Sequence, residues 1–345
     1  MYKKNVKEDM KIRGSAFKKM SAVTKDGDLV NIPNMVMRKF KSKKEQDKML
    51  TDNSICIVCN YKFGEKNIDW SDNIKAICHP FREPQINVLP DDKKLFLLSE
   101  SDFIDESWVP ARINAGGSHD YAIFTIDSSQ GIRCKGYHLL PMILDIAKQE
   151  KVRGLVVRYQ FGKQRIVRPK KGTTEFDLLK VRRSLVRSRR QYANFVDGWF
   201  EQERLCQFMK SSKFVMFPNT KDASPRMISE ALVRGVPIFV NKNIYGGWKY
   251  VNDINGAFFK LPFQMDDLNK NRSQHRKQIS EGIQYMMNTK FNSDNIRKNY
   301  YKYYGFENSA HRLANIINEV EGEEKYEYVF YREFRGDLEK LTKKQ

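Results

Sequence analysis

The chain has 345 residues, 40% of them hydrophobic and 12% aromatic, so it can bury a sizeable core and is long enough for two domains. No run of about 18 apolar residues occurs, which excludes a membrane-spanning helix, and the charged amino terminus lacks the apolar centre of a secretory signal. We therefore expect no transmembrane segment and a cytoplasmic location, or the host cytoplasm if the source is viral.

The chain is strongly basic, with 62 Lys and Arg against 42 Asp and Glu and a formal net charge of +20. Such a balance favours polyanionic partners: nucleic acid, an anionic membrane surface or phosphorylated ligands. Biased genomes also produce Lys-rich chains, so the charge alone does not identify the partner.

The five cysteines form an odd, sparse set, which indicates a reducing compartment rather than a disulfide framework. Cys56-x-x-Cys59, followed by Cys78-His79, suggests zinc ligands. However, the first pair lies in the apolar run 54–61, which is typical of a buried strand, and no second C-x-x-C follows. Free core thiols are therefore favoured, and no metal is expected.

The first third of the chain predicts a small α/β domain. Residues 1–50 carry much charge and little periodicity, whereas apolar runs at 54–61, 74–81 and 93–100, separated by turn-rich stretches, predict strands. A connection at 108–120 that contains Pro and Gly predicts a domain boundary.

After this connection, strand and helix patterns alternate with short links. Predicted strands cover 121–126, 154–159, 194–200, 214–218 and 236–240; predicted helices cover 137–150, 174–191, 201–212 and 224–234, with a polar loop at 127–136. This alternation is typical of right-handed crossovers that build a parallel sheet with helices on both faces. Ligands of such sheets bind beyond the carboxyl ends of the strands, so we expect chemistry in the loops after Ile126, Tyr159 and Pro218. Residues 273–320 predict further helices and 321–345 a charged tail.

The segment 214–240 has the features of a phosphate-binding strand, loop and helix. Ser224 suits the N-cap of the helix, Pro225 suits its first position, and Gly235 suits the left-handed residue after its end. Free N–H groups at the amino end of such a helix attract phosphate oxygens, and Arg226 adds positive charge there. We assign the start of this helix to the donor site: Ser224, Pro225, Arg226 and Met227.

Two carboxylates flank this helix start. Asp222 precedes the helix and Glu230 lies inside it, with seven residues between them. Carboxylates accept hydrogen bonds from vicinal hydroxyls, so the pair suits a ligand with sugar hydroxyls at both ends and phosphate between them, as in a nucleotide sugar. The alternative is that both are ordinary surface acids.

The wider pattern resembles the E-x7-E signature of the retaining glycosyltransferases of the GT-B type. It comprises Asp222-x7-Glu230-Ala231 and Gly235-x-Pro237 before an apolar strand, and it continues through Gly246-Gly247, Tyr250-Val251 and Gly256. Upstream, the run 121–126, Lys135-Gly136 and the following helix resemble the first strand, Lys-Gly and helix of that family. The resemblance covers about residues 119–318 in element order, and its specific part is 222–256.

The resemblance implies an α/β fold of two Rossmann-like domains that face each other across a cleft. Residues 1–114 would bind the acceptor, 115–310 the donor, and 311–345 would form a helix and charged tail that crosses back to the first domain. It also implies a nucleoside-diphosphate sugar as donor, transfer with retention, and neither metal nor cofactor. No catalytic base is assigned, because the departing phosphate takes the acceptor proton in such enzymes.

Individual residues acquire roles through the same resemblance. Glu230 would bind the donor ribose, Asp222 the hydroxyls of the transferred sugar, and Lys135 the diphosphate. The family usually has an arginine soon after the first strand, where this chain has Ile126-Asp127; the later Arg133 is the candidate to take its catalytic role beside Lys135 and Asp222. The donor site would also include Gly246 and Gly247, and His119 is a candidate acceptor or interdomain contact.

The acceptor stays open at this stage. A glycan, glycoprotein or lipid-linked saccharide is favoured, and the very basic stretch 163–190 keeps modified DNA or another polyanion as an alternative. A non-catalytic nucleic-acid-binding protein on the same fold is a further alternative. Asp26-Gly27-Asp28 matches the metal-binding Asp-x-Asp of another glycosyltransferase architecture, but it is more typical of a hairpin turn.

Overall fold

The computed structural model describes residues 20–32, 36–37, 43–44, 47, 54–58, 69–82, 90–106, 119–159, 171–188, 193–262, 268 and 270–331. The chain divides into two compact units. Unit 1 contains residues 1–104 and 302–345, and unit 2 contains residues 105–301. The sequence predicts these boundaries at 114/115 and 310/311.

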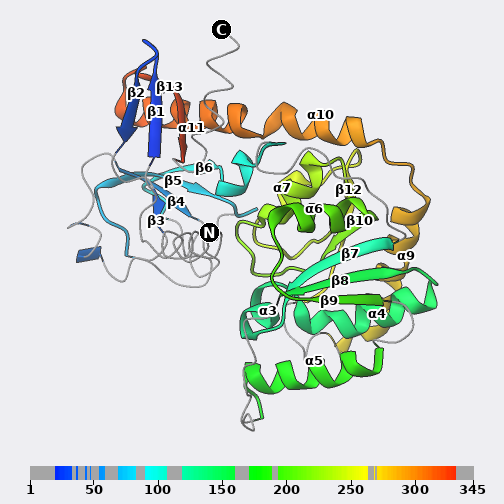
Figure 1. Ribbon diagram of the computed structural model, residues 1–345. Coiled ribbons are helices and arrows are strands. Elements are labelled where there is room, and N and C mark those ends of the chain that lie inside the picture. The colour runs from blue at the N-terminus through cyan, green and yellow to red at the C-terminus, as the bar shows by residue number, and fades with distance from the viewer. Residues whose placement is uncertain are drawn as a thin grey trace, which may run out of the picture. The chain divides into compact units, whose positions relative to one another are not determined.

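Unit 2 is built on a six-stranded parallel sheet (Figure 1). Its strands are β7 (His119–Ile126), β8 (Gly154–Tyr159), β9 (Ala193–Asp197), β10 (Ser212–Phe217), β11 (Ile238–Asn241) and β12 (Gly256–Phe259). The spatial order is β12-β11-β10-β7-β8-β9, so the direction of winding reverses between β7 and β10. In open sheets of this order the ligand crevice lies at the carboxyl ends of the strands beside that reversal.

Helices cover both faces of this sheet, as predicted. They are α3 (Ser129–Cys134), η4 (Tyr137–Leu139), α4 (Leu140–Gln149), α5 (Thr174–Ser188), α6 (Gln202–Lys210), α7 (Arg226–Val233), η5 (Trp248–Tyr250), α9 (Arg272–Asn288) and α10 (Ser293–Tyr303). Figure 1 shows α4 and α5 on one side of the sheet and α6 and α7 on the other. The last residues of α10 continue into unit 1.

The core of unit 2 lies between the sheet and the layer of α4, α5 and α9. Alternate residues of β7, Tyr121 and Ile123, face this layer, because side chains alternate along a strand. They meet the apolar face of α4, where Ile143 and Ala147 are fully buried at helical spacing. Sheet and helices therefore share one continuous apolar cluster that holds the strand ends in place.

Unit 1 contains two sheets. Strands β3 (Val36–Met37), β4 (Ser54–Val58), β5 (Ile74–His79) and β6 (Lys94–Leu97) pair in parallel in that order, which confirms the three predicted apolar strands. A second, antiparallel sheet has the order β13-β1-β2, from β1 (Met20–Thr24), β2 (Leu29–Ile32) and β13 (Tyr326–Tyr331). The described part of this unit also contains the 3-10 helix η2 (Glu100–Phe103) and the helix α11 (Phe306–Glu321).

Two segments have another structure than the one predicted for them, and the edge strand β12 was not predicted. The predicted polar loop 127–136 contains α3, because Ser128 caps the helix by accepting a hydrogen bond from the Gly131 N–H at 3.3 Å. The predicted charged tail contains β13, because Val329 and Phe330 are fully buried while the strand pairs with β1. The Asp-Gly-Asp triplet lies in the turn between β1 and β2, as predicted, and Gly27 has a φ of 89° there.

The described residues also test the predictions of buried core thiols and of no membrane-spanning helix. Cys56, Cys78, Cys134 and Cys206 are buried, as expected of core thiols, and Cys59 lies outside the described part of the chain. Among the described residues, no helix combines the length and apolar character needed to cross a bilayer.

Candidate functional site

The candidate site is formed where β7 and β10 end, at the reversal of strand order. The loop after β7 carries Lys135, and the loop after β10 carries Asp222. The Lys135 ammonium donates to the Asp222 carboxylate, and Asn219 Nδ2 donates to the same oxygen at 2.7 Å. The side chains of Lys135 and Asp222 are 27% and 12% exposed, so a ligand can still reach the pair.

Backbone contacts fix the two loops against each other. The Thr220 N–H donates to the carbonyl oxygen of Cys134 at 3.0 Å, immediately before Lys135. Gly136 adopts the left-handed region, with a φ of 64°, and a Cβ atom there would lie 2.0 Å from the carbonyl oxygen of Pro218. The close approach of the two loops therefore requires glycine at position 136.

The Gly-Gly loop predicted for the donor site joins the same assembly. The Tyr245 N–H donates to the Thr220 carbonyl at 2.9 Å, and the Gly246 N–H donates to the Asp222 carbonyl at 2.8 Å. Gly247 has a φ of 85°, and a Cβ atom there would lie 2.5 Å from Cγ of Pro225. Three loops, which follow β7, β10 and β11, therefore meet around Asp222.

Helix α7 starts one residue later than the sequence predicts. Pro225 is its N-cap residue, without a side-chain capping bond, and Arg226 is its first residue. The prediction of Ser224 as the N-cap is therefore wrong: the Arg226 N–H donates to the Ser224 backbone carbonyl at 3.0 Å, which turns the chain before the helix begins. Gly235 has a φ of 68° and ends the helix as predicted. Arg226 and Met227 form the partly buried first turn.

Glu230 lies in the second turn of α7, where only 6% of the residue is exposed. Its charge acts on Cys206 of α6: burial raises the pKa of the Cys206 thiol to about 12, and Glu230 contributes to that increase. Arg234, one turn further along α7, opposes it. Glu230 therefore lies near Cys206, where α7 contacts α6.

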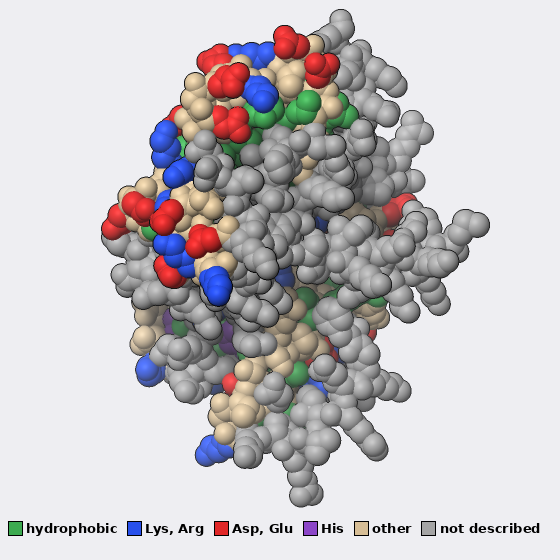
Figure 2. All heavy atoms as spheres, turned by 90° about the vertical axis from the view of Figure 1, so that its left-hand side faces the viewer, with side chains coloured by type: hydrophobic (Ala, Val, Ile, Leu, Met, Phe, Trp, Pro, Cys, Tyr) green, Lys and Arg blue, Asp and Glu red, His purple; other side chains and the backbone are tan. Residues whose placement is uncertain are grey.

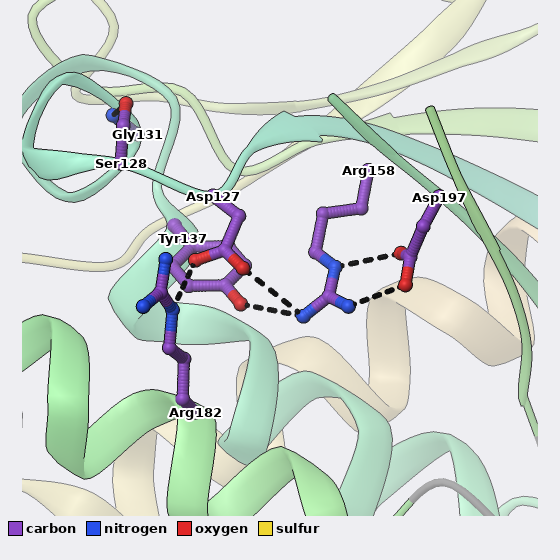
Figure 3. A network of polar contacts seen from close by, with 7 residues as sticks. All are labelled: Asp127, Ser128, Gly131, Tyr137, Arg158, Arg182 and Asp197. Carbon is purple, nitrogen blue, oxygen red and sulfur yellow. Dashed lines mark hydrogen bonds and ion pairs between the residues drawn. The ribbon is translucent and has the colours of Figure 1, made fainter. Parts of the chain in front are cut away.

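A partly buried ionic network lies at the carboxyl ends of β7, β8 and β9, next to the segment that carries Lys135 (Figure 3). Arg158 of β8 donates to both carboxylate oxygens of Asp197 on β9, through Nε at 2.8 Å and Nη2 at 2.6 Å. Its Nη1 donates to the Tyr137 hydroxyl at 3.0 Å and lies 3.4 Å from the Asp127 carboxylate. Arg182 of α5 donates to the other oxygen of Asp127 at 2.7 Å.

The network also changes the acid–base properties of its members. Burial alone would lower the pKa of Arg158, but hydrogen bonds to Asp197 and Tyr137 raise it above the usual value, so the guanidinium stays charged. Burial raises the pKa of Tyr137 to about 12, with Asp127 acting in the same direction, so the phenol stays neutral. Sequence reasoning missed this network. The available signals were the polar residues at strand ends, Asp127, Arg158 and Asp197.

His119, a predicted site residue, is not brought to this assembly. His119 begins β7, about 20 Å along the strand from its carboxyl end, and its Nε2 lies 3.0 Å from Asn194 Nδ2. The structure therefore separates His119 from Lys135 and Asp222. Arg133 lies in α3, two residues before Lys135, and its side chain is outside the described part of the chain.

The basic stretch 163–190 is described only between 171 and 188, where Lys180 and Arg183 are exposed on α5. Figure 2 shows acidic and basic side chains intermingled on the described part of one face of the molecule. Exposed pairs such as Lys94 with Glu319, at 2.9 Å, belong to unit 1. Polyanion binding, including modified DNA as acceptor, stays a prediction.

Comparison with solved structures gives the fold family. The pneumococcal O-GlcNAc transferase GtfA, in complex with UDP and GlcNAc, matches with a TM-score of 0.50 and 10% identity over 81% of this chain and 54% of that chain. A glycosyltransferase from Rickettsia africae matches with a TM-score of 0.51 and 10% identity over 83% and 76%. The lipopolysaccharide outer core galactosyltransferase WaaB, in its apo form, matches with a TM-score of 0.50 and 9% identity over 81% and 78%.

The chain has the GT-B glycosyltransferase fold. This confirms the predicted α/β architecture of parallel sheets and helices, which is the fold of glycosyltransferase enzymes. The chain spans about half the length of the pneumococcal enzyme. No protein-family model and no curated protein sequence matches it. At identities of 9% to 10% the likeness concerns the fold, and the reaction has to be argued from the residues of the site.

Proposed function

We propose that the protein transfers a sugar from a nucleoside-diphosphate sugar to a glycan, glycoprotein or lipid-linked acceptor. The observation that supports this most directly is the contact between Lys135 and Asp222 at the reversal of strand order, beside the amino end of α7. A cation, a carboxylate and the positive end of a helix dipole together match a ligand that alternates phosphate and hydroxyl groups.

In the proposed complex the donor diphosphate lies between Lys135 and the first turn of α7. Its negative charge replaces Asp222 as the partner of Lys135, and Asp222 then accepts hydrogen bonds from the hydroxyls of the transferred sugar. Glu230, further along α7, accepts hydrogen bonds from the ribose. Arg226 adds a second positive charge at the helix start.

The reaction breaks the bond between the anomeric carbon and the diphosphate oxygen and forms a bond from that carbon to an acceptor hydroxyl oxygen. Negative charge develops on the departing nucleoside diphosphate, where Lys135 and the α7 dipole stabilise it. The departing phosphate takes the acceptor proton, so the step needs no protein base, metal or cofactor. The resemblance of 222–256 to the retaining enzymes supports retention at the anomeric carbon.

This function is tested by measuring the release of nucleoside diphosphate from a panel of nucleotide sugars. The panel begins with UDP sugars, because the pneumococcal structure contains UDP. Substitution of any of the three central residues, Lys135→Met, Asp222→Asn or Glu230→Gln, should lower kcat/KM about 100-fold. Lys213→Met is the matched control, because Lys213 pairs with Asp120 at 2.9 Å at the opposite ends of the strands. Its activity should stay at the wild-type level.

Two results would contradict the proposal. The first is the absence of both turnover and thermal stabilisation with every nucleotide sugar of the panel. The second is salt-sensitive DNA binding that is indifferent to Lys135→Met and Glu230→Gln, which would instead support a non-catalytic nucleic-acid-binding protein.

A further inference from the structure

The segment that carries Lys135 is anchored at both ends. It leaves β7 at Asp127 and enters η4 at Tyr137, and α3 and Lys135 lie between these two residues. Both anchors contact one guanidinium group: Arg158 Nη1 lies 3.0 Å from the Tyr137 hydroxyl and 3.4 Å from the Asp127 carboxylate. Arg158 thus joins the beginning and the end of the loop, as Figure 3 shows.

Arg158 is itself held rigidly. It pairs with Asp197 in the register of β8 and β9, and the two-pronged contact between them, at 2.8 and 2.6 Å, fixes the plane of the guanidinium. Only 5% of the residue is exposed. Because its three nitrogens already face Asp197, Tyr137 and Asp127, Arg158 is not arranged to bind a ligand directly.

Arg182 binds the other carboxylate oxygen of Asp127, with its Nε at 2.7 Å from Oδ1. Two carboxylates and two guanidinium groups therefore balance in charge, and the network connects β7, β8, β9 and α5 to the loop. A lysine at position 158 could supply the charge but not the planar fork that reaches three partners.

We propose that Arg158 is a positioning residue that, through Tyr137 and Asp127, holds Lys135 against Asp222. Lys135 follows α3 without a flexible linker, and the backbone bond between Cys134 and Thr220 transmits the position of the loop to the Asp222 side. The consequence for donor binding rests on the proposed function, whereas the effect on the Lys135 position does not.

The position of Lys135 can be tested without any ligand, from the acylation rates of individual lysines measured by mass spectrometry. Arg158→Met should free the Lys135 ammonium from Asp222 and raise its acylation rate severalfold, to the level of Asp222→Asn. Lys213, paired with Asp120 in the same unit, should react at its wild-type rate. Tyr137→Phe, which deletes only the hydroxyl, should give a smaller increase in the Lys135 rate.

Arg276→Met is the matched control variant, because Arg276 also pairs with an aspartate, Asp145, at 2.6 Å, and with Gln149, both on α4. It should leave Lys135 unchanged. An unchanged Lys135 rate in both Arg158→Met and Tyr137→Phe would overturn the inference. So would a parallel increase at Lys135 and Lys213, which would indicate general loosening of the unit.

UDP binding, measured by calorimetry at a temperature where every variant is folded, tests the consequence for the donor. Arg158→Met should weaken binding about tenfold, and Arg158→Lys should rescue it only in part. In Lys135→Met the same Arg158 substitution should have no further effect, because it acts through Lys135. If the losses of UDP affinity from the two substitutions were additive in the double variant, Arg158 would not act through Lys135. Absence of UDP binding by the wild type would exclude a UDP sugar as the donor and leave the acylation result to decide the role of Arg158.

Discussion

His138, next to the anchor Tyr137, is an imidazole buried in the core of unit 2, with 3% of the residue exposed. Burial lowers its pKa from 6.5 to about 4, and the nearby backbone of Ile132 acts weakly in the opposite direction. Between these two values the unfolded chain binds the proton that the folded protein excludes. The contribution of His138 to the free energy of unfolding is therefore fully present above the pKa of the unfolded state. It is lost as the pH falls through the pKa of the folded state, a change of about 3 kcal/mol in all.

Urea unfolding at pH values from 4 to 7 measures this effect. Replacement of the imidazole in His138→Leu should remove most of the dependence of the unfolding free energy on pH in that interval. The same steepness in the variant and the wild type would show that other groups cause the acid sensitivity.

The residues of the site differed in how well the sequence revealed them. Asp222 and Lys135 follow strands whose order predicts neighbouring carboxyl ends, and the structure brings the two side chains together. Arg158 could not be recognised, because its role depends on the register of β8 against β9 and on a hydrogen bond to Tyr137, which the sequence placed only at the start of a predicted helix. An arginine inside an apolar strand indicates a buried ion pair, but the sequence does not show which residues form that pair.

At the scale of elements, strands and long helices were predicted because burial imposes a clear period on them. The predicted strand 154–159 coincides with β8, and the predicted helix 174–191 ends three residues later than α5. Helix α3 was missed because six mostly polar residues show no apolar period, and only its cap is visible in the sequence. Strand β13 was missed because its formation depends on packing against α11, where the ring centroids of Phe330 and Phe306 lie 5.3 Å apart, and on pairing with β1, about 300 residues earlier in the chain.

The junction between α3 and η4 yields a prediction at this scale. Gly136→Ala places a Cβ atom 2.0 Å from the Pro218 carbonyl oxygen and adds about 1–2 kcal/mol for the left-handed backbone. The loop must then move away from the loop that carries Asp222. We expect donor affinity to fall more than about tenfold, measured by calorimetry, together with a lower midpoint of unfolding.

Gly172→Ala provides the matched control for this substitution. Gly172 has a φ of 87°, and a Cβ atom there would meet nothing within 4 Å. It should therefore show the loss of stability caused by the dihedral angle and no loss of affinity. Equal affinity losses in both variants would mean that the contact with Pro218 does not shape the site.

At the scale of the whole molecule, the two units differ in how the chain builds them. Unit 2 is one continuous segment, residues 105–301, whereas unit 1 combines residues 1–104 with 302–345. The second segment supplies α11 and β13, and α11 is tied to the first by Arg312, which donates to the Leu97 carbonyl at 2.7 Å, and by Ser309, which donates to the Asp102 carbonyl at 2.8 Å. The contribution of the carboxyl-terminal residues to the first domain agrees with the predicted crossing back.

This arrangement predicts opposite outcomes for two shortened chains. A chain that ends at Tyr301 loses α11, in which Leu313 and Ile317 are fully buried, and β13, with Phe330. Each buried side chain of this size contributes about 1.5–3 kcal/mol, so the loss of these three alone is comparable with the roughly 5–15 kcal/mol by which a domain is stable. We expect residues 20–104 of that chain to be cleaved rapidly in limited proteolysis, with fragments identified by mass spectrometry.

The segment 105–301 alone, by contrast, should resist the protease and unfold in one cooperative thermal transition, because it keeps the complete six-stranded sheet and its apolar core. It also keeps Lys135, Asp222 and Glu230, so it should retain whatever affinity for a nucleoside diphosphate the full chain has in this unit. Protection of residues 20–104 in the chain that ends at Tyr301 would show that unit 1 folds without its second segment. Rapid cleavage throughout 105–301 would show that unit 2 depends on unit 1 for its stability.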